Sequence, residues 1–154
     1  MLAAQAADTI VGFLHATHQQ DRAVQRTTPL RLEDHADFND YIDDAQLMVN
    51  AAEVGAYLRC KLEEMKDKYA IIGDVRGMGL MQGIELVEDR ATKAPATQAT
   101  AAIMEAARDE RLLIGKGGTY GNVLRCTPPL NISKSDVDEF AGRLSYNFNI
   151  FGNL

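Results

Sequence analysis

Arg125 is the residue of this 154-residue chain whose type and surroundings point most directly to chemistry. It lies between Leu124 and Cys126 in a short apolar segment that Pro128 and Pro129 end, which predicts a strand with the guanidinium at the edge of a core. A guanidinium in such a place requires an anionic partner, and its planar fork matches a carboxylate with two hydrogen bonds. Two interpretations stay open on spacing alone. Arg125 pairs with an internal Asp or Glu, or it accepts the carboxylate of a substrate.

Two glycine-rich segments invite a nucleotide or phosphate interpretation and do not support it. Gly77-Met78-Gly79 with Gly83 has the spacing GxGxxxG, and the residues after it read as a strand, whereas a pyrophosphate site needs a helix N-terminus there. The segment 115–118 likewise leads into a strand, so it lacks the helix that a phosphate-binding loop requires. A hairpin turn and a flexible loop are the better interpretations.

The three histidines offer little for metal binding or catalysis. His15 and His18 are spaced to share a helix face and, with Asp21, could supply at most half of a zinc shell. His35 lies among acidic residues and is expected at the surface. No Ser/His/Asp, Cys/His or paired-carboxylate arrangement emerges from spacing.

Composition excludes several classes of protein. The 22 acidic and 16 basic residues give a net charge of −6, which disfavours binding to a phosphate backbone. Cys60 and Cys126 belong to no CxxC pair and are expected to be reduced. No apolar run reaches the ~18–20 residues of a membrane helix, and residues 1–20 lack the Lys and Arg of a targeting peptide. We therefore expect a cytoplasmic location.

The apolar periodicity changes along the chain and predicts the elements that would position Arg125. A stripe spaced for a helix runs through Leu47, Ala51, Val54, Leu58, Leu62, Met65 and Tyr69, in a helix expected to begin between residues 37 and 43. The other expected elements are a helix at 1–25, strands at 70–76, 80–87, 112–114 and 123–126, a charged loop at 88–95, a helix at 97–108, a mobile loop at 115–121, and a last helix capped by Ser133 or Ser135. This order predicts an α+β fold: a small, mostly antiparallel sheet of three or four strands with helices packed on one face.

From about Asp40 onward the chain resembles the class III, pyridoxal-phosphate-dependent aminotransferases. The resemblance is greatest to the branch of alanine–glyoxylate and ω-amino-acid aminotransferases. The segments that carry it occur in the family's order: 50–55 (NAAEVG), 72–81 (IGDVRGMGLM), 83–87 (GIELV), 112–115 (LLIG) and 122–130 (NVLRCTPPL).

The resemblance implies a particular part of such an enzyme, the small C-terminal domain of fold-type I. In the family, the arginine of the LRxxPPL string binds a carboxylate of the amino or oxo acid, and Arg125 occupies that position. The family's Schiff-base lysine and phosphate cup lie on the large domain. The lysines here, none in the family's lysine motif, are Lys61, Lys66, Lys68, Lys93, Lys116 and Lys134.

The expected organisation is an unmatched N-terminal helix and connector at 1–39, a class III C-terminal-like domain at 40–148, and a tail at 149–154. The expected function is that of a fragment of a transaminase acting between an amino acid or ω-amino acid and a 2-oxo acid. Alone, the chain is expected to bind no pyridoxal phosphate and to be inactive, with a large-domain or aminotransferase subunit as a possible partner. The alternative is a non-catalytic binding or partner module.

Overall fold

The computed structural model describes residues 40–151, and the elements that position Arg125 all lie after Gln46. The helix and connector expected before residue 40, with His15, His18 and His35, lie outside the described residues. The elements are α3 (Leu47–Lys68), β1 (Ile72–Met78), β2 (Met81–Asp89), β3 (Ala94–Pro95), α4 (Thr97–Asp109), β4 (Gly115–Gly117), β5 (Val123–Cys126) and α5 (Lys134–Phe151).

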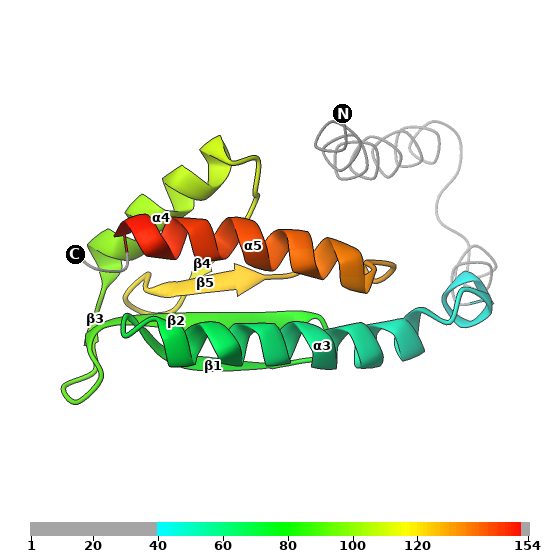
Figure 1. The fold of residues 1–154 in the computed structure, drawn as a ribbon. Helices are drawn as coiled ribbons and strands as arrows, with labels where there is room; N and C mark the ends of the chain where they lie inside the picture. The colour runs from blue at the N-terminus through cyan, green and yellow to red at the C-terminus, as the bar shows by residue number, and fades with distance from the viewer. Residues whose placement is uncertain (1–39, 152–154) are drawn as a thin grey trace, which may run out of the picture. The chain divides into compact units, whose positions relative to one another are not determined.

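The strands form one antiparallel sheet in the order β1-β2-β5-β4, with β3 paired to the end of β2 (Figure 1). Successive side chains of a strand point to opposite faces, so the pairing register assigns each residue to a face. The face we call the packed face carries Val75, Gln82, Ile84, Leu86, Leu124 and Cys126, all buried. The face we call the open face carries Asp74, Arg76, Met78, Met81, Gly83, Glu85, Gly115, Gly117, Val123 and Arg125.

Helices cover the packed face. α3 contacts β1 and β2, α4 contacts β2, β4 and β5, and α5 lies beside both helices (Figure 1). The expected α+β class with helices on one face is confirmed. The sheet has five strands rather than three or four, because two-residue β3 was not anticipated.

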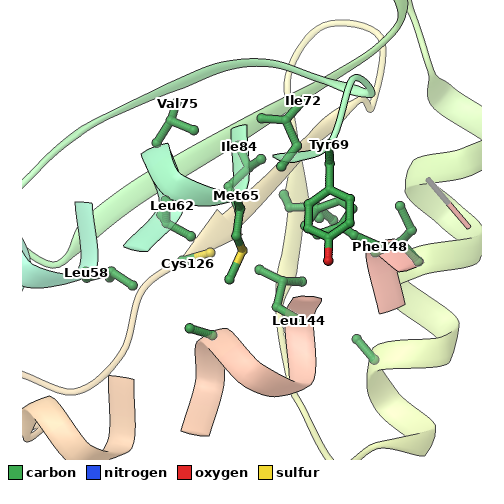
Figure 2. Close-up of a cluster of buried hydrophobic side chains, with 14 of the residues drawn as sticks. Leu58, Leu62, Met65, Tyr69, Ile72, Val75, Ile84, Cys126, Leu144 and Phe148 are labelled. Carbon is green, nitrogen blue, oxygen red and sulfur yellow. The ribbon is translucent and has the colours of Figure 1, made fainter. Parts of the chain in front are cut away.

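The predicted stripe of α3 is the centre of the core. Leu58 and Leu62 are fully buried against Ile72, Val75 and Ile84, and Figure 2 shows these side chains converging with Leu144 and Phe148 of α5. The ring centroids of Tyr69 and Phe148 lie 5.3 Å apart. Its hydroxyl donates to the Ser145 carbonyl at 3.0 Å, so this partly polar residue is satisfied within the core.

Two glycines let α3 approach the β1–β2 hairpin closely. The hairpin turns at Gly79 and Leu80, and Gly79 has a φ of 53°, a conformation that glycine adopts at no steric cost. A Cβ built on Gly55 of α3 would lie 2.3 Å from the carbonyl carbon of Gly79. Helix and turn are therefore in backbone contact, which explains a glycine in the middle of a helix.

The expected start of α3 is wrong by several residues. Residues 40–44 are helical, but Gln46 has a φ of 51°, and α3 begins only at Leu47. A left-handed residue cannot continue an α-helix, so α3 begins at Leu47, the first residue of the apolar stripe, and not between residues 37 and 43.

The expected strand at 112–114 is also wrong, because these residues follow the C-terminal cap of α4. Arg111 adopts a φ of 58°, its N–H donates to the Arg108 carbonyl, and the N–H of Leu112 donates to the Ala107 carbonyl at 2.7 Å. This is the Schellman arrangement, here without its usual glycine. The strand begins instead at Gly115, inside the segment expected to be a mobile loop.

The last helix is capped by Ser133, one of the two residues predicted for this position. Ser133 is the cap: its hydroxyl accepts from the N–H of Asp136 at 3.2 Å, and its own N–H donates to the Asp136 carboxylate at 3.0 Å. α5 continues to Phe151, so residues 149–151 are helical where a tail was expected.

Candidate functional site

Arg125 lies on the open face, in a strand whose other residues are buried. Leu124 and Cys126 on either side of it point to the packed face, whereas the Arg125 side chain is exposed. Burial raises the pKa of the Cys126 thiol to about 12, which makes this neighbour a core residue and not a nucleophile. The apolar neighbours of Arg125 in the sequence therefore anchor its strand and leave the guanidinium outside.

The register aligns four residues in one row across the open face. Arg76 of β1 pairs with Gly83 of β2, Gly83 pairs with Arg125, and Arg125 pairs with Gly115 of β4. Arg125 is thus flanked by glycine on both neighbouring strands, so no side chain stands directly beside it. Of the two interpretations left open by the sequence, the structure offers no support for an internal pair. Within residues 40–151 no carboxylate lies within ion-pair distance of Arg125.

Arg76, two strands away on the same face, is held by two carboxylates. Its Nη1 donates to Asp74 Oδ2 at 3.0 Å and to Glu85 Oε2. These hydrogen bonds, the one to Glu85 first and the one to Asp74 second, raise the pKa of Arg76. Burial favours a higher pKa for Asp74, but the hydrogen bond from Arg76 and the charges of Lys66 and Arg76 outweigh it and lower the pKa. The two acidic side chains that the register places on the open face are therefore already engaged by Arg76.

The spacing of residues alone did not reveal this ion network of Asp74, Arg76 and Glu85, in which Lys66 also lies 3.6 Å from Asp74. The signal was present, because Asp74 and Arg76 are two residues apart in a predicted strand and so share a face. Glu85 could be added only once the hairpin register was known, which pairs it with Asp74.

Two asparagines fix the strand that carries Arg125. At its start, Asn122 Nδ2 donates to the Leu86 carbonyl at 2.9 Å, and the Leu86 N–H donates to the Asn122 carbonyl at 2.8 Å. Beyond its end, Asn50 Nδ2 donates to the carbonyls of Leu130 at 2.7 Å and Ile132 at 3.0 Å. Both asparagines lie in segments that carry the family resemblance. Their hydrogen bonds give a structural reason for an asparagine at these two positions.

The two glycine-rich segments form no nucleotide or phosphate site. Gly77 and Gly79 lie in and after β1, the hairpin continues into β2, and the segment 115–118 leads through a turn into β5, so neither precedes a helix. Within the described residues, no group of three or more His, Cys, Asp or Glu could hold a metal ion. In the same part of the chain, every helix is too short or too polar to span a bilayer.

The fold and the site thus define an α+β module whose sheet carries on its open face an exposed arginine with no ion pair among residues 40–151. A family model described as aminotransferase class III matches residues 29–147. The chain belongs to the class III aminotransferase family, as the resemblance predicted.

Known relatives agree with this assignment. The chain is 51% identical over 106 residues to alanine–glyoxylate aminotransferase 2 homolog 2, mitochondrial, of Arabidopsis thaliana, covering 69% of this chain and 22% of that protein. It is 40% identical over 100 residues to an alanine/serine racemase of Pyrococcus horikoshii, covering 65% and 21%. The chain therefore spans about a fifth of the length of these relatives.

Solved structures show the same fold. An aminotransferase from Bacillus anthracis superposes with a TM-score of 0.69 at 33% identity, over 72% of this chain and 26% of that one. An amine transaminase from an uncultivated Pseudomonas species, solved in its pyridoxal-phosphate-bound internal aldimine form, superposes with a TM-score of 0.66 at 32% identity, over 73% and 26%. The family is therefore pyridoxal-phosphate-dependent.

The lysines of this chain do not fit covalent attachment of that cofactor. A lysine that forms a Schiff base needs a neutral amine, which burial in an apolar pocket favours. All six lysines lie in the described part and none is buried. Lys61 lies 3.8 Å from Glu64, whose charge raises the lysine pKa, the wrong direction for this chemistry.

Proposed function

We propose that this chain is the C-terminal small-domain part of a class III aminotransferase, in which Arg125 binds the carboxylate of the substrate. The reaction would move an amino group between an amino acid or ω-amino acid and a 2-oxo acid. The observation that carries the proposal is the contrast on the open face, where Arg76 holds two carboxylates and Arg125 holds none among the described residues. An exposed guanidinium on a strand fixed at both ends is a suitable receptor for an external carboxylate.

The carboxylate is the part of the substrate that this chain can address. An aminotransferase for alanine and glyoxylate and a racemase for alanine and serine, both similar to this chain, act on molecules that share this group. Binding it does not distinguish amino-group transfer from racemisation, because both need the substrate oriented by its carboxylate. Arg125 would bind and orient the substrate, while pyridoxal phosphate, which stabilises the carbanion in this family, would come from a domain outside these residues.

Titration of the chain with pyruvate and with glutamate, followed by ¹H–¹⁵N NMR, tests the role of Arg125. We expect saturable shifts at the Arg125 side chain and at the amides of β4 and β5. Arg125→Ala should weaken binding about tenfold or more, since hydrogen bonds to charged groups contribute ~1.5–3 kcal/mol. Arg108→Ala, an exposed arginine on α4 that pairs with Glu105, is the control and should bind as the wild type does. Absence of saturable shifts, or equal affinity in Arg125→Ala, would contradict the proposal.

A second experiment tests whether the chain acts alone. After incubation with pyridoxal phosphate and borohydride reduction, we expect no stoichiometric adduct on any single lysine by mass spectrometry. A stoichiometric adduct on one lysine would show a cofactor site within this chain. Co-purification with a protein that contains the large domain would instead favour a small domain working as a separate partner module.

A further inference from the structure

The edge strand β4 presents two glycines to Arg125. Gly115 pairs directly with Arg125, and Gly117 pairs with Val123 on the same face, whereas Lys116 between them pairs with Leu124 and points to the other face. We call the side-chain-free surface of Gly115 and Gly117 the glycine trough. It lies along one flank of Arg125, where an ordinary strand would place two side chains.

The stem of Arg125 occupies this trough. A Cβ built on Gly117 would lie 3.2 Å from Arg125 Cδ and 3.5 Å from its Cγ. A Cβ built on Gly115 would lie 3.4 Å from Arg125 Nε and 3.6 Å from its Nη2. The arginine therefore leans over β4, with its aliphatic carbons above Gly117 and its guanidinium above Gly115.

Backbone conformation does not explain these two glycines. The glycines with positive φ in the described residues are Gly77, Gly79, Gly118 and Gly121. Gly115 and Gly117 have ordinary strand conformations that any residue adopts, and a glycine inside a strand weakens it. Among the described residues, the Arg125 side chain lies against the Cβ position of both glycines.

We propose that Gly115 and Gly117 are positioning residues that set where Arg125 presents its guanidinium. An arginine side chain has many rotamers, and a trough that fits its stem restricts them before a ligand arrives. A methyl group added at Gly117 would lie 3.2 Å from Arg125 Cδ, so the stem must shift to make room and the guanidinium shifts with it. The inference rests on the proposed role of Arg125 as a carboxylate receptor, and it concerns residues that do not touch the substrate.

The test compares Gly117→Ala and Gly115→Ala with Gly83→Ala. Gly83 flanks Arg125 from β2 on the same face, but a Cβ there would meet only Val123 at 3.4 Å and the Arg76 carbonyl at 3.6 Å. The first measurement needs no ligand: nuclear Overhauser effects between the Arg125 δ-protons and the Gly117 α-protons. We expect them in the wild type and in Gly83→Ala, and expect a changed pattern of contacts between the Arg125 δ-protons and residue 117 in Gly117→Ala, because the stem must shift there.

The second measurement is the dissociation constant for pyruvate. We expect a rise of about threefold or more in Gly117→Ala, a smaller rise in Gly115→Ala, and no change in Gly83→Ala. In an Arg125→Ala background, Gly117→Ala should leave the residual affinity unchanged and raise the unfolding temperature, because the space is then empty. A rise in the dissociation constant without Arg125 would indicate a merely structural role and overturn the inference.

The two proposals fail in different ways. A wild type that binds no carboxylate but shows the Arg125–Gly117 contacts would contradict the proposed function and leave the trough in place. If the wild type binds pyruvate through Arg125 but lacks those contacts, only the proposed positioning role of Gly115 and Gly117 is contradicted. The same holds if Gly117→Ala binds pyruvate as tightly as the wild type does.

Discussion

The two faces of the sheet carry out different tasks, and the difference is sharpest between two adjacent residues of one strand. Leu124 is fully buried against the helices, and Arg125, the next residue, is exposed with no partner among the described side chains. The packed face carries mostly buried apolar side chains, whereas the charged side chains and most of the glycines assigned by the register lie on the open face. The alternation of side chains along a strand thus places an exposed, charged residue directly after a core residue without burying it.

The largest effect should come from truncating the packed face. Leu124→Ala removes a fully buried side chain and leaves a cavity, so we expect a loss of about 2–5 kcal/mol in the free energy of unfolding. Arg125→Ala should change it by less than ~0.5 kcal/mol, because the side chain is exposed. Urea unfolding followed by circular dichroism measures both. Similar losses of unfolding free energy in the two variants would show that residues of the open face contribute to stability as much as those of the packed face.

Overfilling the packed side should have a smaller but clear effect. Gly55→Ala places a methyl group against the backbone of Gly79, which cannot move away as a side chain could, and we expect a loss of about 1–3 kcal/mol. Gly142→Ala on α5 is the matched control, since nothing lies within 4 Å of its Cβ position, and alanine there should be neutral or stabilising. A Gly55→Ala protein as stable as Gly142→Ala would contradict the contact between α3 and the hairpin.

The smallest effect concerns the two arginines of the open face and depends on pH. Because the pKa of Asp74 is lowered in the folded state, its contribution to stability is present above its unfolded pKa of about 3.9 and is lost as the pH falls through the folded value. Arg76→Gln should raise the pKa of Asp74, followed by carboxyl ¹³C NMR, and should cost less than ~1 kcal/mol near neutral pH.

Arg125→Gln serves as the control for that titration. It alters a guanidinium on the same face that does not contact Asp74, so the pKa of Asp74 should stay as in the wild type. An equal rise in both variants would mean that the carboxylates respond to the charge of the whole face and that Arg76 does not hold them specifically.

The sequence could predict the packed face better than the open one. The stripe from Leu47 to Tyr69 repeats at helical spacing, and burial of a whole face makes such a pattern unambiguous. β4 was missed because its residues, Gly115 and Gly117 among them, have low strand propensity and become a strand only by pairing with β5. The strand expected at 112–114 is wrong because these residues follow the cap of α4, where Arg111 holds the left-handed position that glycine usually marks.

The site itself was predicted only as a single residue. Arg125 could be singled out from its apolar neighbours and from the family's LRxxPPL string. Its lack of an ion pair among the described residues, the engagement of Glu85 by Arg76 and the space over Gly117 depend on which strands are neighbours. Neighbouring strands that are 40 residues apart in the sequence cannot be paired from the pattern of one segment.

The hydrogen bonds from Asn50 to the chain beyond β5 have a thermodynamic consequence for ligand capture. They join the first turns of α3 to the segment that follows the two prolines, some 80 residues later. These hydrogen bonds order the backbone beyond Arg125 when the protein folds, so the entropy of that ordering is lost before any ligand arrives. A substrate entering such a receptor would meet a backbone that is already ordered, so its residence time would depend on the side-chain contact itself.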